Sequence, residues 1–242
     1  MVNWITGTSE SVPRQVARLM AGRLASAADA RGTALLALPG GRSVGRVAEA
    51  LRTEEMAVPW ERVHLFFVDE RCVDLESPES NYQALREPFL EPLITAGRLP
   101  RSNLHLPQEI GDGPCDPGAY TRALEAAAGG PGPARFDVVL LGVGEDGHVA
   151  SLFPDHSALR NQEREYLLVE DAPKEPPRRI TASRRLIASA ETAIALFLGE
   201  GKREALQRFR GLSPDAARAT VPELPCSLVH TVDDAWGATD LA

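Results

Sequence analysis

Apolar segments that end in glycine alternate with helical stretches along most of this chain, and this alternation limits its fold more than any other feature. The runs at 33–41 (TALLALPGG) and 63–70 (VHLFFVDE) are each followed by a segment with helical spacing. The pattern begins again at 136 (FDVVLLGVGEDGH) and at 192 (TAIALFLGEG). Strands that are apolar on both faces are typical of parallel sheets covered by helices. We therefore expect an α/β fold with a mainly parallel sheet and helices on both faces.

Other segments supply the expected helices and the end of the sheet. The spacing of apolar residues predicts an amphipathic helix over 10–30 and a proline-bounded helix over 81–93. One short helix is expected between the Pro/Gly-rich loops at 111–118 and 128–133, and CSLVHTV (226–232) is interpreted as the last strand. A length of 242 residues would allow two small domains, but no linker divides the chain. We expect a single domain over 1–242.

Charge and composition limit the classes of molecule that the protein can bind. A formal net charge of −8 disfavours nucleic acid and anionic membranes. No signal peptide or long apolar segment is evident, which predicts a soluble, cytoplasmic protein. The three cysteines Cys72, Cys115 and Cys226 lack metal-type spacing, so we expect reduced thiols, with Cys72 a buried, inert one. A small anionic ligand is compatible with this charge where Lys and Arg cluster locally, because charges farther away are screened.

Four loops follow the predicted strands and combine glycine with polar or charged residues. They are PGGRS (39–43), VDERC (68–72), GVGEDGH (142–148) and GEGK (199–202). Ligands of open parallel sheets bind beyond the carboxyl ends of the strands. Any one of these loops can be explained as a simple strand terminator, but four together predict a site.

His148 is the candidate for proton transfer. Imidazole has an unperturbed pKa of about 6.5 and accepts a proton from water at neutral pH, and Asp146 is placed to orient or polarise the ring. A structural histidine is the alternative. The glycines of GVGEDGH spell a dinucleotide fingerprint, but Pro154 and the absence of a long following helix argue against it. No metal-ligand spacing is present, so we expect neither metal nor cofactor.

Acidic, amide and basic residues on the other loops complete the candidate site. Asp69, Glu70 and Arg71 offer a base and a positive clamp, although a surface ion pair is the alternative. Asn81 is either a hydroxyl-binding amide or a helix N-cap. The backbone N–H groups of Gly40 and Gly41 precede a helix and are suited to a phosphate. The basic residues that could converge on it are Arg42, Arg71, Lys174, Arg178, Arg179 and Lys202. Lys174 and Arg179 lie in a segment stiffened by three prolines.

These motifs resemble those of the 6-phosphogluconolactonases. The matching segments are FFVDERCV with SPESNYQALRE, FDVVLLGVGEDGHVASLFPDHSAL, APKEPPRRIT, GEGKREAL and LPCSLV, and they cover roughly residues 34–230 in the same order. The related glucosamine-6-phosphate deaminases also contain DGH, but they typically continue toward FNEP and favour DEY over DER.

The resemblance implies a fold of the phosphosugar-isomerase (Rossmann-like) type and metal-free hydrolysis of 6-phosphoglucono-1,5-lactone in the oxidative pentose phosphate pathway. His148 resembles the general base, and Asp69 and Asp146 resemble conserved acids. Residues that resemble substrate-binding positions are Arg71, Asn81, Lys174, Arg179 and Lys202, the last two for phosphate. Two departures stand out: Arg42 precedes Ser43 where the family has Ser or Thr, and Arg184 and Arg185 lie in a usually apolar segment.

The expected mechanism is attack on the lactone carbonyl by a water that His148 deprotonates, with Arg71 or backbone N–H groups stabilising the oxyanion. No G-x-S-x-G elbow supports a serine nucleophile. The rival hypotheses are an amino-sugar phosphate isomerase or deaminase and a catalytically inactive sugar-phosphate sensor. The sensor lacks support because the chain has no DNA-binding appendage. We expect a monomer or weak homo-oligomer.

Overall fold

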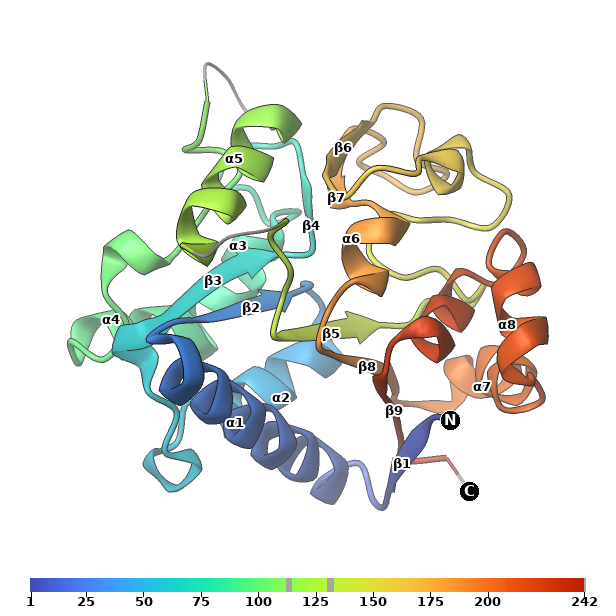
Figure 1. Ribbon diagram of the computed structural model, residues 1–242, viewed down its shortest axis with the longest axis horizontal. Helices are drawn as coiled ribbons and strands as arrows, with labels where there is room; N and C mark the ends of the chain where they lie inside the picture. Colours follow the sequence, from blue (N-terminus) through green and yellow to red (C-terminus); the bar gives the residue numbers. More distant parts are fainter. Residues whose placement is uncertain (112–114, 130–132, 242) are drawn as a thin grey trace.

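A parallel six-stranded sheet forms the centre of the protein. The computed structural model describes residues 1–111, 115–129 and 133–241. The strands run in the order β1-β9-β8-β5-β2-β3, and every pair is parallel. Their bounds are β1 Asn3–Thr6, β2 Ala34–Leu38, β3 Val63–Phe67, β5 Val138–Gly142, β8 Thr192–Phe197 and β9 Asp234–Thr239. The α/β fold with a mainly parallel sheet is confirmed (Figure 1).

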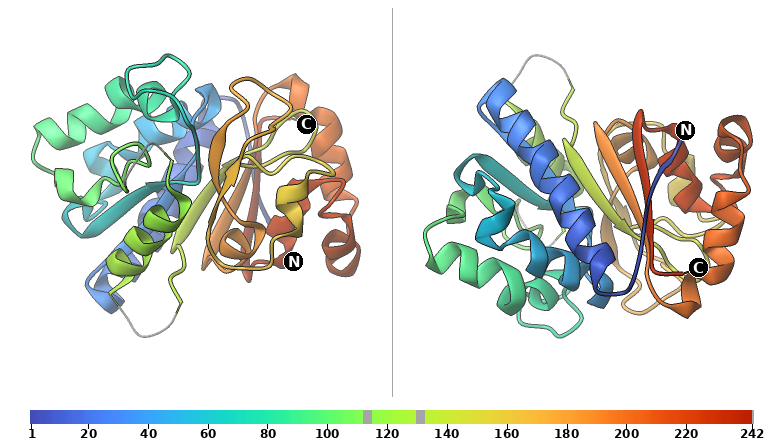
Figure 2. Two further views of the ribbon diagram at one scale, coloured as in Figure 1. Left: turned by 90° about the horizontal axis from the view of Figure 1, so that it is seen from above. Right: turned by 90° about the horizontal axis from the view of Figure 1, so that it is seen from below.

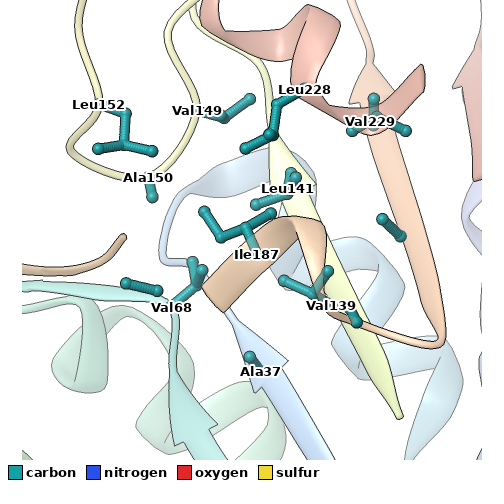
Figure 3. Close-up of a cluster of buried hydrophobic side chains, with 14 of the residues drawn as sticks. Ala37, Val68, Val139, Leu141, Val149, Ala150, Leu152, Ile187, Leu228 and Val229 are labelled. Carbon is teal, nitrogen blue, oxygen red and sulfur yellow. The ribbon is translucent and has the colours of Figure 1, made fainter. Parts of the chain in front are cut away.

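Alternation of side chains along the central strands explains the two helical layers. Successive residues of a strand point to opposite faces. Leu36, Leu38 and Leu140 pack with α1 and α2 in one buried cluster, whereas Val139 and Leu141 belong to another. In Figure 3 this second cluster brings Leu141 beside Ile187 and Leu228. Figure 2 shows helices on both sides of the sheet, and α1 lies across one of these two sides.

The helices largely follow the predicted pattern. Their bounds are α1 Ser11–Arg31, α2 Arg42–Leu51, α3 Asn81–Leu85, α4 Glu91–Thr95, α5 Pro117–Ala128, α6 Arg184–Ala188, α7 Arg203–Arg210 and α8 Pro214–Thr220. The predicted helix over 81–93 is interrupted by a π-helical turn at Arg86–Leu90. Of the loops predicted around α5, residues 112–114 and 130–132 lie outside the described residues. No described helix is long and apolar enough to span a membrane.

A second, antiparallel sheet begins where the expected strand 63–70 breaks. It has the order β4-β7-β6, with β4 at Asp69–Arg71, β6 at Tyr166–Val169 and β7 at Arg179–Ala182. Val68 joins the sheets, because its N–H donates to Leu38 of the large sheet and its carbonyl accepts from Ala182 of the small one. The acidic residues after β3 therefore belong to the small sheet.

The prediction of a last strand at CSLVHTV is wrong. Residues Pro225–Thr231 form a 3-10 helix, which starts at a proline and whose Cys226 N–H donates 2.9 Å to the carbonyl of Gly147. The last strand is β9, whose sequence DAWGAT is too polar for an apolar run to reveal it. It is nevertheless buried over most of its length because β1 and β8 flank it.

The expectation of reduced thiols throughout is also wrong for this structure. Cys72 and Cys115 form a disulfide, while Cys226 is a buried free cysteine. Their separation of 43 residues gave no hint of the pairing, which depends on the loop before α5 lying beside the end of β4. Burial raises the pKa of the Cys226 thiol to about 12, so this cysteine is inert.

Two histidines, His64 on the edge strand β3 and His105 beside it, are expected to make the stability of the fold depend on pH. His64 Nδ1 lies 3.0 Å from His105 Nε2, and His105 also stacks on Phe66. Burial, with the charges of His64 and Arg101, lowers the pKa of His105 to about 4. A histidine with a lowered folded-state pKa binds protons more readily when unfolded. The contribution of neutral His105 to the stability of the folded state is complete above about pH 6.5 and is lost as the pH falls towards 4.

We therefore expect the free energy of unfolding to fall between pH 6.5 and 4 by up to about 3 kcal/mol from this residue. Urea unfolding at pH 7.5, 6.0 and 5.0 measures the change. His105→Phe, which keeps an aromatic ring but cannot be protonated, should flatten the profile, and His156→Ala should not. An unchanged slope in His105→Phe contradicts the assignment.

Candidate active site

The site lies at the topological switch point of the large sheet, where consecutive strands begin to be added toward the opposite edge. From β2 the chain proceeds to its neighbour β3 at one edge, whereas β5, β8 and β9 follow one another toward the other. The switch point therefore lies between β2 and β5, and ligands of open α/β sheets bind beyond the strand ends at such a point. A cleft of about 500 Å³ occupies this position.

Three of the four predicted loops line this cleft. They contribute Gly40, Gly41, Arg42, Ser43, Gly142, Val143, Gly144, Glu145, His148, Gly199, Glu200, Gly201 and Lys202. Lys174 joins them from the segment between β6 and β7. The fourth loop, VDERC, does not line the cleft because it has passed into the small sheet as β4.

Glycine shapes the wall of the cleft at the end of β2. Gly41 has φ +101°, a conformation that other residues rarely adopt, and it is the N-cap of α2. A Cβ on Gly40 would overlap the side chain of Asn81. The turn therefore brings the unpaired N–H groups of the first turn of α2 to the cleft, together with the side chain of Arg42.

His148, Asp146 and Lys174 form a hydrogen-bonded group at the cleft. His148 Nδ1 lies 2.5 Å from Asp146 Oδ1, and Lys174 Nζ lies 3.2 Å from Asp146 Oδ2. Lys174 Nζ is also 3.3 Å from His148 Nδ1, but a nitrogen that donates to Asp146 cannot accept from Lys174. Partial burial raises the pKa of Asp146, but the hydrogen bonds from His148 and the charge of Lys174 outweigh it and hold the pKa well below its usual range. Asp146 is therefore ionised and fixes Nδ1 as the protonated ring nitrogen.

Close packing holds the imidazole in place. A Cβ on Gly144 would overlap His148 and Asp146, so the ring rests against the backbone of the same loop. On another side, the ring centroid of His148 lies 4.7 Å from that of the buried Phe153. Phe153 also lies under Lys174, whose Nζ is 5.9 Å from the ring centroid. The sequence predicted no role for Phe153, which follows His148 in the segment GVGEDGHVASLFPDHSAL.

Lys202 and Glu145 provide further charges in the cleft. Burial lowers the pKa of Lys202, whereas the nearby carboxylate of Glu145 raises it. Glu145 packs against Gly201, where a Cβ would lie 2.5 Å from its Oε1. Glu145 was not predicted as a site residue, although it lies in the predicted loop GVGEDGH.

Arg179 does not line the cleft. It is only 4% exposed, and its guanidinium donates to the carbonyls of Lys174, Glu175 and Pro176. Burial lowers its pKa, but arginine remains charged at any physiological pH. Its contacts hold the proline-rich segment that carries Lys174.

Asp69 and Asn81 are also buried beside the cleft rather than in its lining. Asp69 Oδ2 accepts a 2.8 Å hydrogen bond from Ser151 Oγ, and Asn81 Nδ2 donates to the backbone carbonyl of Asp69. Ser151 belongs to the loop that follows His148. These contacts tie that loop to β4 and to the start of α3, and the N-cap of α3 is Ser80 rather than Asn81.

Arg71 and Glu70 anchor the same junction. Arg71 donates 2.5 Å to the carbonyl of Glu79, so its guanidinium is engaged outside the cleft. Glu70 is fully buried and accepts from the backbone of Arg71, Asn81 and Tyr82 and from the Ser80 hydroxyl. Burial raises the pKa of Glu70, against the opposing effect of these four donors. Within residues 1–111, 115–129 and 133–241, no cluster of three or more His, Cys, Asp or Glu side chains is arranged to hold a metal ion.

Comparison with known proteins identifies relatives over nearly the whole chain. The profile of the family described as glucosamine-6-phosphate isomerases/6-phosphogluconolactonase matches residues 7–236. A 6-phosphogluconolactonase of Mycobacterium tuberculosis is 36% identical over 197 residues, which make up 77% of this chain and 76% of that protein. The GDH/6PGL endoplasmic bifunctional protein of Homo sapiens is 38% identical over 175 residues, which cover 70% of this chain but 21% of that longer protein. The crystal structure of a 6-phosphogluconolactonase from Shewanella baltica has a TM-score of 0.76 and 25% identity, covering 99% of this chain and 97% of that one.

Proposed function

This chain belongs to the glucosamine-6-phosphate isomerase/6-phosphogluconolactonase family, and from this premise we propose that it hydrolyses 6-phospho-D-glucono-1,5-lactone to 6-phosphogluconate. The observation that carries the proposal is the His148–Asp146 pair, held at a cleft that Arg42, Lys174 and Lys202 also line. An oriented base and a concentration of positive charge suit a lactone that carries a phosphate. The reaction belongs to the oxidative pentose phosphate pathway.

His148 is the general base in this proposal. Because Nδ1 donates to Asp146, the neutral ring leaves Nε2 without a proton and able to accept one from water. The water adds its oxygen to the C1 carbonyl, and the carbonyl electron pair moves onto the carbonyl oxygen. When the C1–O5 bond breaks, the imidazolium returns the proton to the departing ring oxygen, which becomes the hydroxyl of the product. Asp146 stabilises the transient imidazolium.

The phosphate is assigned to the part of the cleft formed by the start of α2 and by Lys202. The N-terminal N–H groups of α2 and the side chains of Arg42 and Lys202 line the cleft there. A helix N-terminus favours an anion through both its free N–H groups and its dipole. Arg42 takes the place of the hydroxyl residue seen in related sequences and supplies a charged fork instead.

Lys174 is the side chain placed to stabilise the oxyanion. It lines the cleft and lies against the His148–Asp146 pair, whereas Arg71, the residue named from the sequence, is bound to Glu79. Backbone N–H groups of the glycine-rich loops are further donors. In this scheme Arg179 is a positioning residue for Lys174, and Asp69 and Asn81 position the loop that bears His148.

The rival within the family is isomerisation or deamination of an amino-sugar phosphate. That reaction requires an acid and a base suited to enolisation. Here Asp69 is buried against Ser151 and Asn81, and the chain reads DER and LFPD where the isomerases carry DEY and FNEP. These features favour the lactonase.

The proposed function also bears on the cellular location, the partners and the oligomeric state of the protein. We propose a cytoplasmic setting, because a phosphorylated sugar formed there does not cross a lipid bilayer unaided. The net charge of −8 gives no support for nucleic-acid binding. Among the described residues, Met1 is the only exposed large hydrophobic side chain, which favours a monomer or weak homo-oligomer of a single-domain chain.

The decisive experiment follows lactone disappearance above the spontaneous rate. 6-Phosphogluconolactone is generated in situ with glucose-6-phosphate dehydrogenase, and unphosphorylated gluconolactone is tested in parallel. We expect acceleration with the phosphorylated lactone alone. Release of ammonia from glucosamine 6-phosphate, with no effect on the lactone, would instead establish the isomerase-type reaction. Binding of sugar phosphate without turnover of either substrate would indicate a sensor.

Lys202→Met is expected to raise KM by about 10–100-fold with a smaller change in kcat, because a charged hydrogen bond to the phosphate contributes about 1.5–3 kcal/mol. Steady-state kinetics of the variant measure both constants. Lys202→Arg, which retains the charge, should recover part of the affinity. A fall in kcat at unchanged KM would place Lys202 at the reacting carbonyl rather than at the phosphate.

A further inference from the structure

A second hollow, distinct from the cleft of His148, lies between α6, α8 and the 3-10 helix Pro225–Thr231 (Figure 1 labels both α-helices). Its volume is about 300 Å³. The lining consists of Arg184, Arg185, Ala188, Arg218, Val221, Leu228 and Thr231. None of these residues lines the cleft of His148. We name this hollow the arginine groove.

The charges of the arginine groove are not neutralised by the protein. Arg184 Nε donates to the carbonyl of Asn161, and Arg185 Nε donates to the side-chain oxygen of Gln162, so both acceptors are neutral. In residues 1–111, 115–129 and 133–241, no carboxylate forms an ion pair with either of them or with Arg218. Three cations therefore share one small hollow on a protein whose net charge is −8.

Such an arrangement favours binding of an anion. Like charges held close together repel one another, and an anion between them removes this repulsion. Nε makes the hydrogen bonds of Arg184 and Arg185, and among the described residues no hydrogen bond uses their terminal guanidinium nitrogens, which stay available. Arginine presents these nitrogens as a planar fork that matches the oxygens of a phosphate.

The floor of the groove specifies the rest of the ligand. Ala188, Val221 and Leu228 provide apolar surface beside the arginines, and the hydroxyl of Thr231 donates to the carbonyl of Leu228. A volume of 300 Å³ is at the small end of sites that hold organic ligands, which run from about 300 to 1,000 Å³. We propose that the arginine groove binds a small organic phosphate, with the phosphate on Arg184, Arg185 and Arg218 and its apolar part on this floor.

The test uses phenyl phosphate as the probe and follows backbone amide resonances of the 15N-labelled protein. We expect shifts at Val221, Leu228 and Thr231 that titrate separately from those at Gly40 and Gly199 in the cleft of His148. The double variant Arg185→Ala/Arg218→Ala should weaken the first binding event at least tenfold. The control Arg18→Ala/Arg122→Ala removes the same charge from exposed positions of α1 and α5, away from the groove, and should stay within twofold of the native protein.

Three outcomes overturn the inference. Shifts confined to the cleft of His148 would show that the arginine groove stays empty. Equal weakening in both double variants would show a general effect of net charge. Inorganic phosphate that binds the groove as tightly as phenyl phosphate would eliminate the apolar part of the proposal. The lactone assay of the same variants reports the proposed function independently, because these arginines lie outside the cleft of His148.

Discussion

Replacement of His148 by alanine is expected to lower kcat by about 10²–10⁴-fold, while the lactone still binds. The variant removes the only imidazole that lines the cleft in the described part of the chain, and with it the acceptor for the proton of the attacking water. The loss corresponds to about 3–5 kcal/mol of transition-state stabilisation. Lys202 and the N-terminus of α2 remain, so KM should change little. Stopped-flow measurement of lactone decay, corrected for the spontaneous rate, tests both constants.

His156 offers a matched control for this variant. It lies eight residues after His148, its ring Nε2 contacts Asp171, and it does not line the cleft. His156→Ala should therefore keep the native kcat. Addition of imidazole to His148→Ala should restore part of the rate beyond the solution background, since alanine leaves room for it. Retention of full activity by His148→Ala would show that another group activates the water.

The sequence predicted the central strands because they are apolar on both faces. β2, β5 and β8 occupy the middle of the sheet, so burial demanded uninterrupted apolar runs that can be recognised locally. β1 is an edge strand that pairs with β9, and β9 pairs in turn with β8, which a local sequence pattern does not reveal. β4 was not predicted as a separate strand for another reason. Its residues directly follow the apolar run of β3, and only their pairing with β7 shows that they belong to a different sheet.

The position of the site could be predicted from the sequence, but the contacts of several of its neighbouring side chains could not. Loops that follow adjacent central strands converge by topology, so Gly41, His148 and Lys202 meet as expected. Arg179 and Arg71 were predicted as substrate-binding residues from their charge, from the family resemblance and, for Arg179, from its proline-stiffened segment. Their guanidinium groups bind backbone carbonyls of their own surroundings, and only the three-dimensional arrangement distinguishes such a brace from a ligand contact. The disulfide of Cys72 and Cys115 is hidden in the sequence for the same reason.

Gly144→Ala is expected to reduce kcat about 100-fold although it alters no group that reacts. The added Cβ would overlap Nδ1 of His148 and Oδ1 of Asp146, and Phe153 behind the ring leaves the imidazole little room to retreat. Displacement of a catalytic group by about 1 Å can cost about 100-fold in rate. Unlike His148→Ala, this variant keeps its imidazole, so added imidazole should not rescue it.

A glycine elsewhere separates this steric effect from a general effect of the substitution. Gly22 lies inside α1, and a Cβ there meets no atom within 4 Å. Gly22→Ala should leave kcat unchanged and stabilise the protein by up to about 1 kcal/mol, because alanine favours the helix. If Gly144→Ala lowers kcat while its unfolding transition in urea stays near that of the native protein, the loss lies in the placement of His148. If Gly144→Ala retains the native kcat, catalysis does not depend on the position that Asp146 and Phe153 impose on the ring.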